Sequence, residues 1–196
     1  MYSKLEPPRK HFPIMFSTTA NILTLVRIIL IPILVFAFYM GTPQWRLAAA
    51  IIFIVGCITD YLDGYVARTF SQVSRLGQFL DPMADKLLVA TTLFLMAGFD
   101  RISRYSFIPA IIILSREILV SGLREHLSNF RETLAVTQLA KWKTAIQMLA
   151  ICFLLVGDTA EIVTPARYLG EVMLWCAAML TIITGFSYVK LSIRHF

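Results

Sequence analysis

Six long apolar runs constrain this chain more than any other feature of its sequence. They cover residues 21–40, 46–63, 79–99, 105–123, 138–157 and 166–190. Each run is close to the ~20 apolar residues that a helix needs to cross the hydrocarbon of a bilayer. Because backbone polar groups must be satisfied internally in lipid, each run predicts a helix. We therefore expect an all-α integral membrane protein, with a cytoplasmic juxtamembrane segment over 1–20 and one domain of six transmembrane helices over 21–196.

The composition agrees with a membrane protein. Of the 196 residues, 58% are hydrophobic and 15% are charged. In a soluble domain, about 45–50% of the residues are apolar and about 25% are charged. This balance argues against a disordered chain and against a disulfide-stapled secreted module. Cys57, Cys152 and Cys176 each lie in an apolar run without paired spacing. We interpret them as small buried apolar residues, not as disulfides or metal ligands.

The basic residues predict the orientation of the spans. With a cytoplasmic N-terminus, eleven of them fall in inside segments and four in outside segments, and the inside set is Lys4, Arg9, Lys10, Arg68, Arg75, Arg124, Arg131, Lys141, Lys143, Lys190 and Arg194. Cytoplasmic loops of membrane proteins carry an excess of Lys and Arg. The net charge of +6 is therefore explained without a nucleic-acid partner. Both termini are expected in the cytoplasm.

Ionisable residues inside spans are functional candidates, because each costs ~3 kcal/mol on insertion scales. This chain has Arg27, Asp60, Asp63, Asp81, Asp85, Lys86, Arg116 and Glu117 in or at the ends of its spans. The predicted orientation places these charges at the cytoplasmic ends or halves of their spans. They predict a polar cavity that faces the cytoplasm.

Four of these charges are carboxylates on two neighbouring helices. Asp60 and Asp63 close the second run, and Asp81 and Asp85 open the third. If the segments are helical, each pair shares one helix face. Four adjacent carboxylates repel one another unless they are protonated or bind cations. Oxygen ligands without His or Cys favour magnesium, manganese or calcium over zinc.

Small and basic residues accompany the acids. Gly64 and Ala67 share the face of Asp60 in a helix, so a bulky ligand could approach there, and Arg68 is placed to meet a phosphate. The group predicts a metal-assisted phosphoryl-transfer site. Two structural interpretations remain open at this point. Asp81 before Pro82 could be a helix N-cap, which would leave Gly77 in the loop. Gly64 and Ala67 could serve helix packing alone.

The pattern resembles the signature of the CDP-alcohol phosphotransferases. It reads Asp-x-x-Asp-Gly-x-x-Ala-Arg, eight residues, then Gly-x-x-x-Asp-x-x-x-Asp, from Asp60 to Asp85. The resemblance implies six spans, a site with two divalent ions (Mg²⁺ or Mn²⁺), a homodimer, and displacement of CMP from a CDP-linked substrate by an alcohol. It also implies that Asp60, Asp63, Asp81 and Asp85 hold the metals and that Asp85 is the catalytic base.

Further segments resemble the bacterial members of the family that make phosphatidylglycerophosphate. These segments include Asn21–Pro32, Leu80–Lys86, Arg116–Arg124 and Lys141–Met148. This resemblance implies CDP-diacylglycerol and glycerol 3-phosphate as substrates, and the bacterial inner membrane as the location. It implies that CDP-diacylglycerol contacts Asn21, Thr24, Arg27, Gly64, Ala67, Arg68 and Gly77.

An acceptor that carries its own phosphate needs a second basic pocket. The candidates are Arg116, Arg124, Lys141 and Lys143. Arg116 is the deepest, whereas Lys141 and Lys143 are expected nearer to water. Arg116 could instead neutralise an acid. A direct pair with Glu117 is awkward because adjacent helical residues diverge by about 100°.

Two other functional classes fit parts of the sequence. A sister enzyme of the same family could use serine, inositol, inositol phosphate or phosphatidylglycerol as its acceptor. A divalent-cation transporter would also carry buried acids, but it predicts acids spread along a path across the bilayer. The acids of this chain gather instead at one side.

Overall fold

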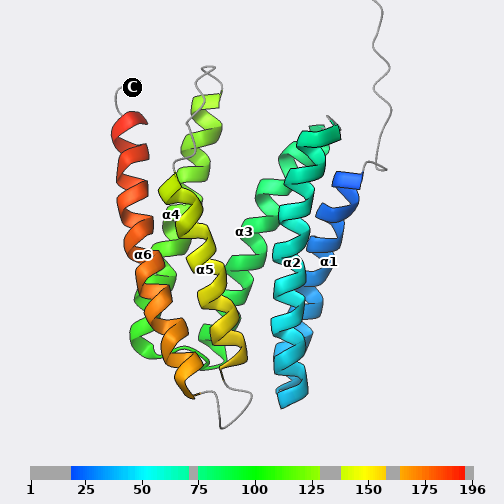
Figure 1. The fold of residues 1–196 in the computed structure, drawn as a ribbon, viewed down its shortest axis with the longest axis vertical. Helices are drawn as coiled ribbons and strands as arrows, with labels where there is room; N and C mark the ends of the chain where they lie inside the picture. The colour runs from blue at the N-terminus through cyan, green and yellow to red at the C-terminus, as the bar shows by residue number, and fades with distance from the viewer. Residues whose placement is uncertain (1–18, 71–74, 129–137, 158–163, 193–196) are drawn as a thin grey trace, which may run out of the picture.

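The chain folds into long helices in the computed structural model, which describes residues 19–70, 75–128, 138–157 and 164–192, with side chains over 22–62, 80–123, 138–157 and 165–186. Within these residues there is no strand. The elements are α1 (Thr19–Met40), α2 (Pro43–Phe70), α3 (Arg75–Gly98), the short 3₁₀-helix η1 (Arg104–Ser106), α4 (Phe107–Ser128), α5 (Gln138–Val156) and α6 (Thr164–Ser192) (Figure 1). Each α-helix covers one of the six predicted apolar runs, which confirms the all-α prediction.

Five parts of this fold are long and apolar enough to cross a membrane. They are Ile22–Met40, Pro43–Leu62, Arg104–Leu123, Gln138–Val156 and Pro165–Phe186. α3 is not among them. Its first half carries Asp81, Asp85 and Lys86, which reduce its hydropathy. Large apolar side chains are exposed, including Tyr39, Phe94 and Phe186 at about 70% each. Such surfaces mark contact with lipid or protein, not water.

The connection between α1 and α2 is a tight turn built by three residues. Gly41 has a positive φ of 68°, a conformation that costs glycine little because it has no Cβ. The side chain and the carbonyl of Thr42 accept hydrogen bonds from the first turn of α2, from Trp45 N (3.5 Å) and Arg46 N (3.0 Å). Pro43 begins α2, where its missing N–H is not needed. This turn separates the first two apolar runs of the sequence.

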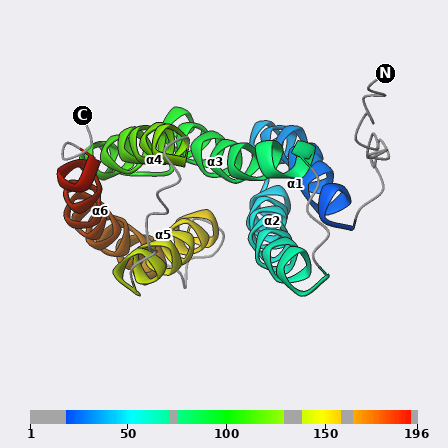
Figure 2. The same ribbon diagram turned by 90° about the horizontal axis from the view of Figure 1, so that it is seen from above.

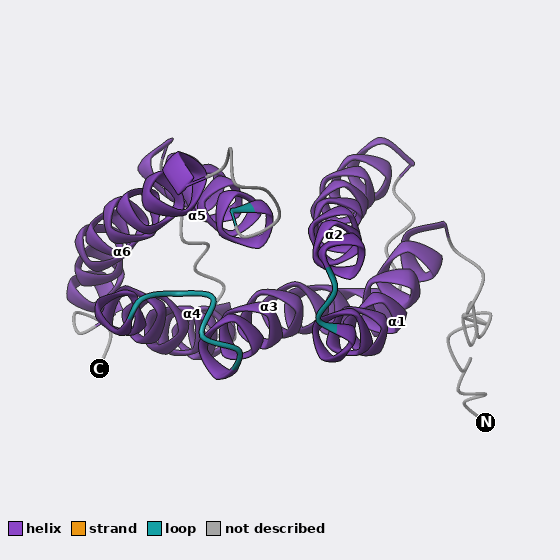
Figure 3. Cartoon of the chain, turned by 90° about the horizontal axis from the view of Figure 1, so that it is seen from below, coloured by secondary structure: helices purple, strands orange, loops and turns teal. Residues whose placement is uncertain are grey.

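The helices form two groups that meet along one junction. α1 packs against α2 and α3, and α6 packs against α4 and α5. Seen along the bundle, α4, α3 and α1 form one row, while α2 and α5 face each other on the other side (Figures 2 and 3). α2 contacts α5, but α3 contacts α4 and α5 over short stretches only. The buried core includes Phe38, Phe53, Leu88, Ile151 and Leu154.

The cysteines are free thiols, as predicted. Cys57 and Cys152 are half-buried, and the Cys57 thiol lies 3.6 Å from Met148 Sδ. Cys176 is exposed, so its predicted burial is wrong. It lies on the outer side of α6, where a small apolar side chain is equally compatible with lipid.

Candidate active site

Three helices bring polar side chains together at the end of the bundle where α1 begins. α1 presents Thr24 and Arg27 one turn apart, which places both on one helix face. The Thr24 hydroxyl donates a hydrogen bond to Asp81 of α3. Arg27 Nη1 lies 3.1 Å from Asp60 Oδ1 of α2. α1 therefore holds one carboxylate from each of the two acid-bearing helices.

Burial differs sharply across the Arg27–Asp60 pair. The Arg27 side chain is fully buried, whereas 45% of the Asp60 side chain is exposed. Asp60 also interacts electrostatically with Asp81 and Asp85. Asp60, Asp81 and Asp85 therefore lie near enough to one another to interact electrostatically.

The cluster is incomplete in the described part of the chain. Seven predicted site residues have side chains outside it: Asn21, Asp63, Gly64, Ala67, Arg68, Gly77 and Arg124. Among the described side chains, no three of His, Cys, Asp or Glu lie close enough to form a metal site on their own. The donor set nevertheless fits hard divalent ions, because it consists of carboxylate oxygens, one of them well exposed.

The interpretation of Asp81 as an N-cap is wrong. α3 begins at Arg75, so Asp81 lies in its second turn and Gly77 is helical. Pro82 then lies inside the helix and cannot donate a backbone hydrogen bond there. The side-chain ammonium of Lys86 binds the Pro82 carbonyl at 2.8 Å. The segment is therefore an unusual helical turn, with acids on both sides of a proline.

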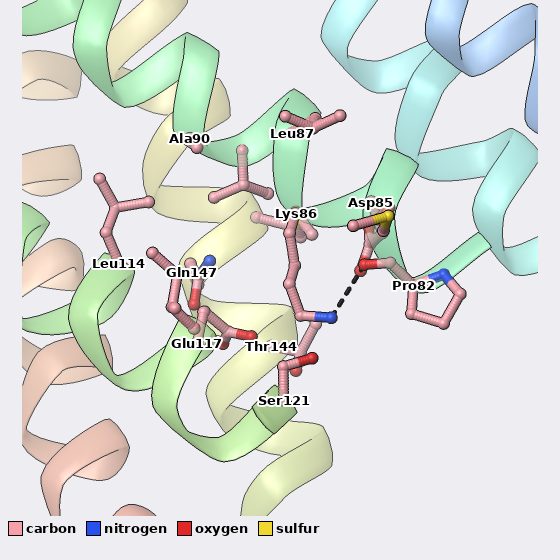
Figure 4. Close-up of a pocket in the computed structure, with 14 residues that line it drawn as sticks. Pro82, Asp85, Lys86, Leu87, Ala90, Leu114, Glu117, Ser121, Thr144 and Gln147 are labelled. Carbon is pink, nitrogen blue, oxygen red and sulfur yellow. Dashed lines mark hydrogen bonds between the residues drawn. The ribbon is translucent and has the colours of Figure 1, made fainter. Parts of the chain in front are cut away.

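A cavity of about 740 Å³ lies between α3, α4 and α5. Asp85 and Lys86 line it from α3, Glu117 and Ser121 from α4, and Thr144 and Gln147 from α5 (Figure 4). Apolar side chains, including Leu87, Ala90, Leu114 and Met148, form the remainder of the wall. An apolar pocket with a few convergent polar groups is typical of a ligand site.

Glu117 is the centre of the polar network beside this cavity. Its carboxylate binds the ammonium of Lys143 from α5 and lies 3.7 Å from Arg116 Nη1. Arg116 Nη2 donates to the Thr184 hydroxyl of α6 at 3.2 Å. α6 can approach Arg116 closely because Gly185 has no Cβ. A Cβ at this position would lie only 3.1 Å from Arg116 Cγ. One carboxylate thus links α4, α5 and, through Arg116, α6.

Two expectations about the basic residues are wrong. Arg116 does pair with Glu117, because its long side chain bends back despite the divergence of adjacent helical positions. Lys143 is not near water, since only 3% of it is exposed. It faces α4 from within α5, whereas Lys141 is exposed two residues earlier. Neither Arg116 nor Lys143 lines the cavity itself.

Glu117 and Lys86, which were predicted as functional candidates because they are charges inside spans, both line the cavity; sequence reasoning had assigned neither of them a specific role. It also missed Glu171 of α6, at the opposite end of the bundle. Its carboxylate accepts hydrogen bonds from the backbone N–H (2.9 Å) and hydroxyl (2.8 Å) of Ser103. Arg167 lies 3.6 Å from Glu171, so this cluster is a structural link between α6 and η1.

The fold and site together define a class: a helical membrane protein with acidic residues beside a largely apolar cavity that has a few polar groups in its wall. Comparison with known families is more specific. The model of the CDP-alcohol phosphatidyltransferase family matches residues 17–183, and the chain belongs to this family of enzymes.

Several curated bacterial proteins are similar over most of their length. A CDP-diacylglycerol–glycerol-3-phosphate 3-phosphatidyltransferase of Rickettsia bellii is 42% identical over 90% of this chain and 96% of its own. Proteins with the same name from Haemophilus influenzae and Cereibacter sphaeroides are 40% and 34% identical, over 87% and 89% of this chain and 90% and 95% of theirs.

Proposed function

We propose that this enzyme transfers the phosphatidyl group of CDP-diacylglycerol to glycerol 3-phosphate, giving phosphatidylglycerophosphate and CMP. One structural observation supports the proposal: Asp60 of α2 lies close enough to Asp81 and Asp85 of α3 to interact with them electrostatically, and Asp85 lines a cavity. The names and full-length similarity of the bacterial relatives support the choice of substrates.

The metal-binding residues in this proposal are Asp60, Asp63, Asp81 and Asp85. Two magnesium or manganese ions held there would neutralise the diphosphate and the charge that develops on departing CMP. The chain's own contacts fit this role. Thr24 and Arg27 fix Asp81 and Asp60 in place, which preorganises two carboxylates before a substrate arrives.

Asp85 is the proposed general base. It lines the cavity, so it can meet an acceptor hydroxyl there. Asp85 takes the proton of that hydroxyl as the oxygen attacks the β-phosphorus of CDP-diacylglycerol. A new phosphorus–oxygen bond forms, the bond to the CMP oxygen breaks, and CMP leaves with the electron pair. No nucleophilic residue of the enzyme is required for this displacement.

The acceptor phosphate is proposed to bind on the side of the cavity where Glu117 gathers two cations. Arg116 and Lys143 both approach its carboxylate, so this wall has an excess of one positive charge. Exposed Lys141 and, outside the described side chains, Arg124 would extend the basic surface outward. This excess favours a phosphorylated acceptor over serine or inositol.

We further propose that the chain has six spans in the bacterial inner membrane, and that α3 is a span in addition to the five described above. Its 24 residues would extend for about 36 Å, enough for the hydrocarbon core. Asp81 contacts α1, and Asp85 and Lys86 line the cavity, so these three charges are not turned toward lipid. The positive-inside rule then places the acidic end and both termini in the cytoplasm. The homodimer rests on the family resemblance.

The orientation can be tested by labelling single cysteines in a variant without Cys57, Cys152 and Cys176. In intact cells, an impermeant thiol reagent should label Thr42→Cys, which is exposed at the turn between α1 and α2. It should label Gln138→Cys, exposed at the start of α5, only after the membrane is opened. The reverse pattern would place the acidic site outside the cell.

The function is tested by measuring CMP release from CDP-diacylglycerol in detergent with a panel of acceptors. Glycerol 3-phosphate should support turnover with magnesium or manganese, and excess EDTA should abolish it. Asp85→Asn should be inactive. Thr181→Val, a buried substitution on α6 away from the cavity lining, should retain activity. Turnover with serine, inositol, inositol phosphate or phosphatidylglycerol instead would indicate a sister enzyme. Divalent-cation uptake by proteoliposomes without CMP release would indicate a transporter.

A further inference from the structure

Lys86 is the basic side chain that reaches the cavity wall. Of the described residues that line the cavity, it alone carries a positive charge. It follows Asp85 directly on α3, and both side chains contribute to the same wall (Figure 4). A ligand held by Lys86 would therefore lie beside the proposed general base.

The other cations near the site are engaged by carboxylates. Arg27 pairs with Asp60, and Arg116 and Lys143 share Glu117. Lys86 differs, because its ammonium binds the neutral carbonyl of Pro82. Within the described part of the chain, no carboxylate lies within salt-bridge distance of its Nζ atom. An ammonium group has three N–H donors, so a single bond to a carbonyl leaves two donors for a ligand.

Hydroxyl groups complete the surroundings of Lys86. Ser121 of α4 and Thr144 of α5 line the same cavity from the facing helices (Figure 4). Beside this cation, Ser121 can donate a hydrogen bond to a phosphate oxygen, whereas the Thr144 hydroxyl donates to the Ala140 carbonyl (3.1 Å) and would exchange that partner for a phosphate oxygen. This environment would offer little to a neutral acceptor beyond ordinary hydrogen bonds.

We propose that Lys86 binds the phosphate group of the acceptor directly and thereby selects a phosphorylated alcohol. This inference rests on the proposed function and deepens it. Arg116 and Lys143, which both interact with Glu117, do not line the cavity and contribute a favourable electrostatic field. Lys86 makes the direct contact with the phosphate. With the phosphate on Lys86, the acceptor hydroxyl is directed toward Asp85, its neighbour on the helix.

Lys86→Met tests the proposal, because methionine keeps an unbranched side chain and removes the charge. Loss of a charge-assisted contact predicts that the KM for glycerol 3-phosphate rises roughly tenfold to hundredfold. The KM for CDP-diacylglycerol should change less than about twofold. Inorganic phosphate, used as a competitive probe, should inhibit the variant more weakly by a similar factor. Lys86→Arg should recover part of the affinity because it restores the charge.

Arg104→Met is the matched control. It also removes one exposed positive charge, but from η1 at the opposite end of the bundle, and it should leave both KM values unchanged. If Lys86→Met does not fold, Lys86→Gln replaces it, because its amide can still donate to the Pro82 carbonyl.

The outcomes separate this inference from the proposed function. If the wild-type enzyme uses glycerol 3-phosphate but the uncharged variant keeps its KM, or raises both KM values equally, the role of Lys86 is refuted and the function stands. If the wild-type enzyme releases CMP only with a neutral acceptor, the proposed function fails before any variant is compared.

Discussion

Replacing Arg27 with methionine tests the contact that fastens α1 to the acid-bearing end of α2. Arg27 Nη1 lies 3.1 Å from Asp60 Oδ1, and the arginine side chain is fully buried. Methionine preserves much of the length and apolar volume of arginine but leaves Asp60 without this cation. We expect the variant to fold with reduced stability.

The expected size of the effect follows from the unequal burial of the pair. A hydrogen bond that involves a charged group contributes about 1.5–3 kcal/mol to stability, whereas an exposed ion pair contributes about 0–1 kcal/mol. Because 45% of the Asp60 side chain is exposed, we expect an intermediate coupling of about 1–2 kcal/mol. In a chain of this length, this corresponds to a fall in Tm of roughly 2–8 °C.

The assay is a double-mutant cycle in one detergent, with melting followed by tryptophan fluorescence at a fixed scan rate. Arg27→Met, Asp60→Asn and the double variant are compared in excess EDTA, so that metal binding by Asp60 cannot contribute. The double variant should be more stable than the sum of the two single effects predicts. If the single effects add within about 0.3–0.5 kcal/mol, the contact does not stabilise the fold and our reasoning is refuted.

Three further predictions concern catalysis, acceptor binding and packing. Asp85→Asn should abolish CMP release but leave CDP-diacylglycerol binding, measured by equilibrium titration, largely intact; an equal loss of metal binding and turnover would make Asp85 a ligand only. Arg116→Ala should raise the KM for glycerol 3-phosphate more than that for CDP-diacylglycerol, but less than Lys86→Met does, because Arg116 does not line the cavity; equal rises in both KM values would show a structural role. Gly170→Ala should lower stability by about 1–3 kcal/mol, because its Cβ would lie 2.8 Å from Leu154 Cγ; Gly98→Ala, with open space around it, should not change the Tm.

The helices and the convergence of the acids could be predicted from the sequence alone. Apolar runs of membrane length allow few alternatives to a helix, so α1 to α6 fall where the runs fall. The common level of Asp60, Asp81 and Asp85 follows from their positions at the ends of neighbouring spans. The distance of each acid along the chain from the connection between α2 and α3 is local information, and the sequence contains it.

The partners of individual side chains could not be predicted in the same way. Glu117 binds Lys143 across 26 residues of sequence, and Arg116 binds Thr184 across 68. Such pairs depend on how each helix is rotated about its own axis when it packs. Lys141 and Lys143 lie two residues apart, about 200° around the helix axis, so the rotation of α5 decides which of them is buried. The position of a lysine along its span therefore did not show whether its side chain is near water.

The junction between the two helix groups has a mechanical consequence for a lipid substrate. The cavity lies between α3 of one group and α4 and α5 of the other, and α3 contacts these two helices only over short stretches. Acyl chains that stay in the bilayer must approach such a cavity from the side instead of from water. Parting the groups along this junction disrupts less apolar packing than separating helices within either group, where α1 lies against α2 and α5 against α6. The wall of the cavity is thus shared by the two groups, with Asp85 from α3 and Glu117 and Thr144 from α4 and α5, so a lipid that enters along this junction would meet the proposed base directly.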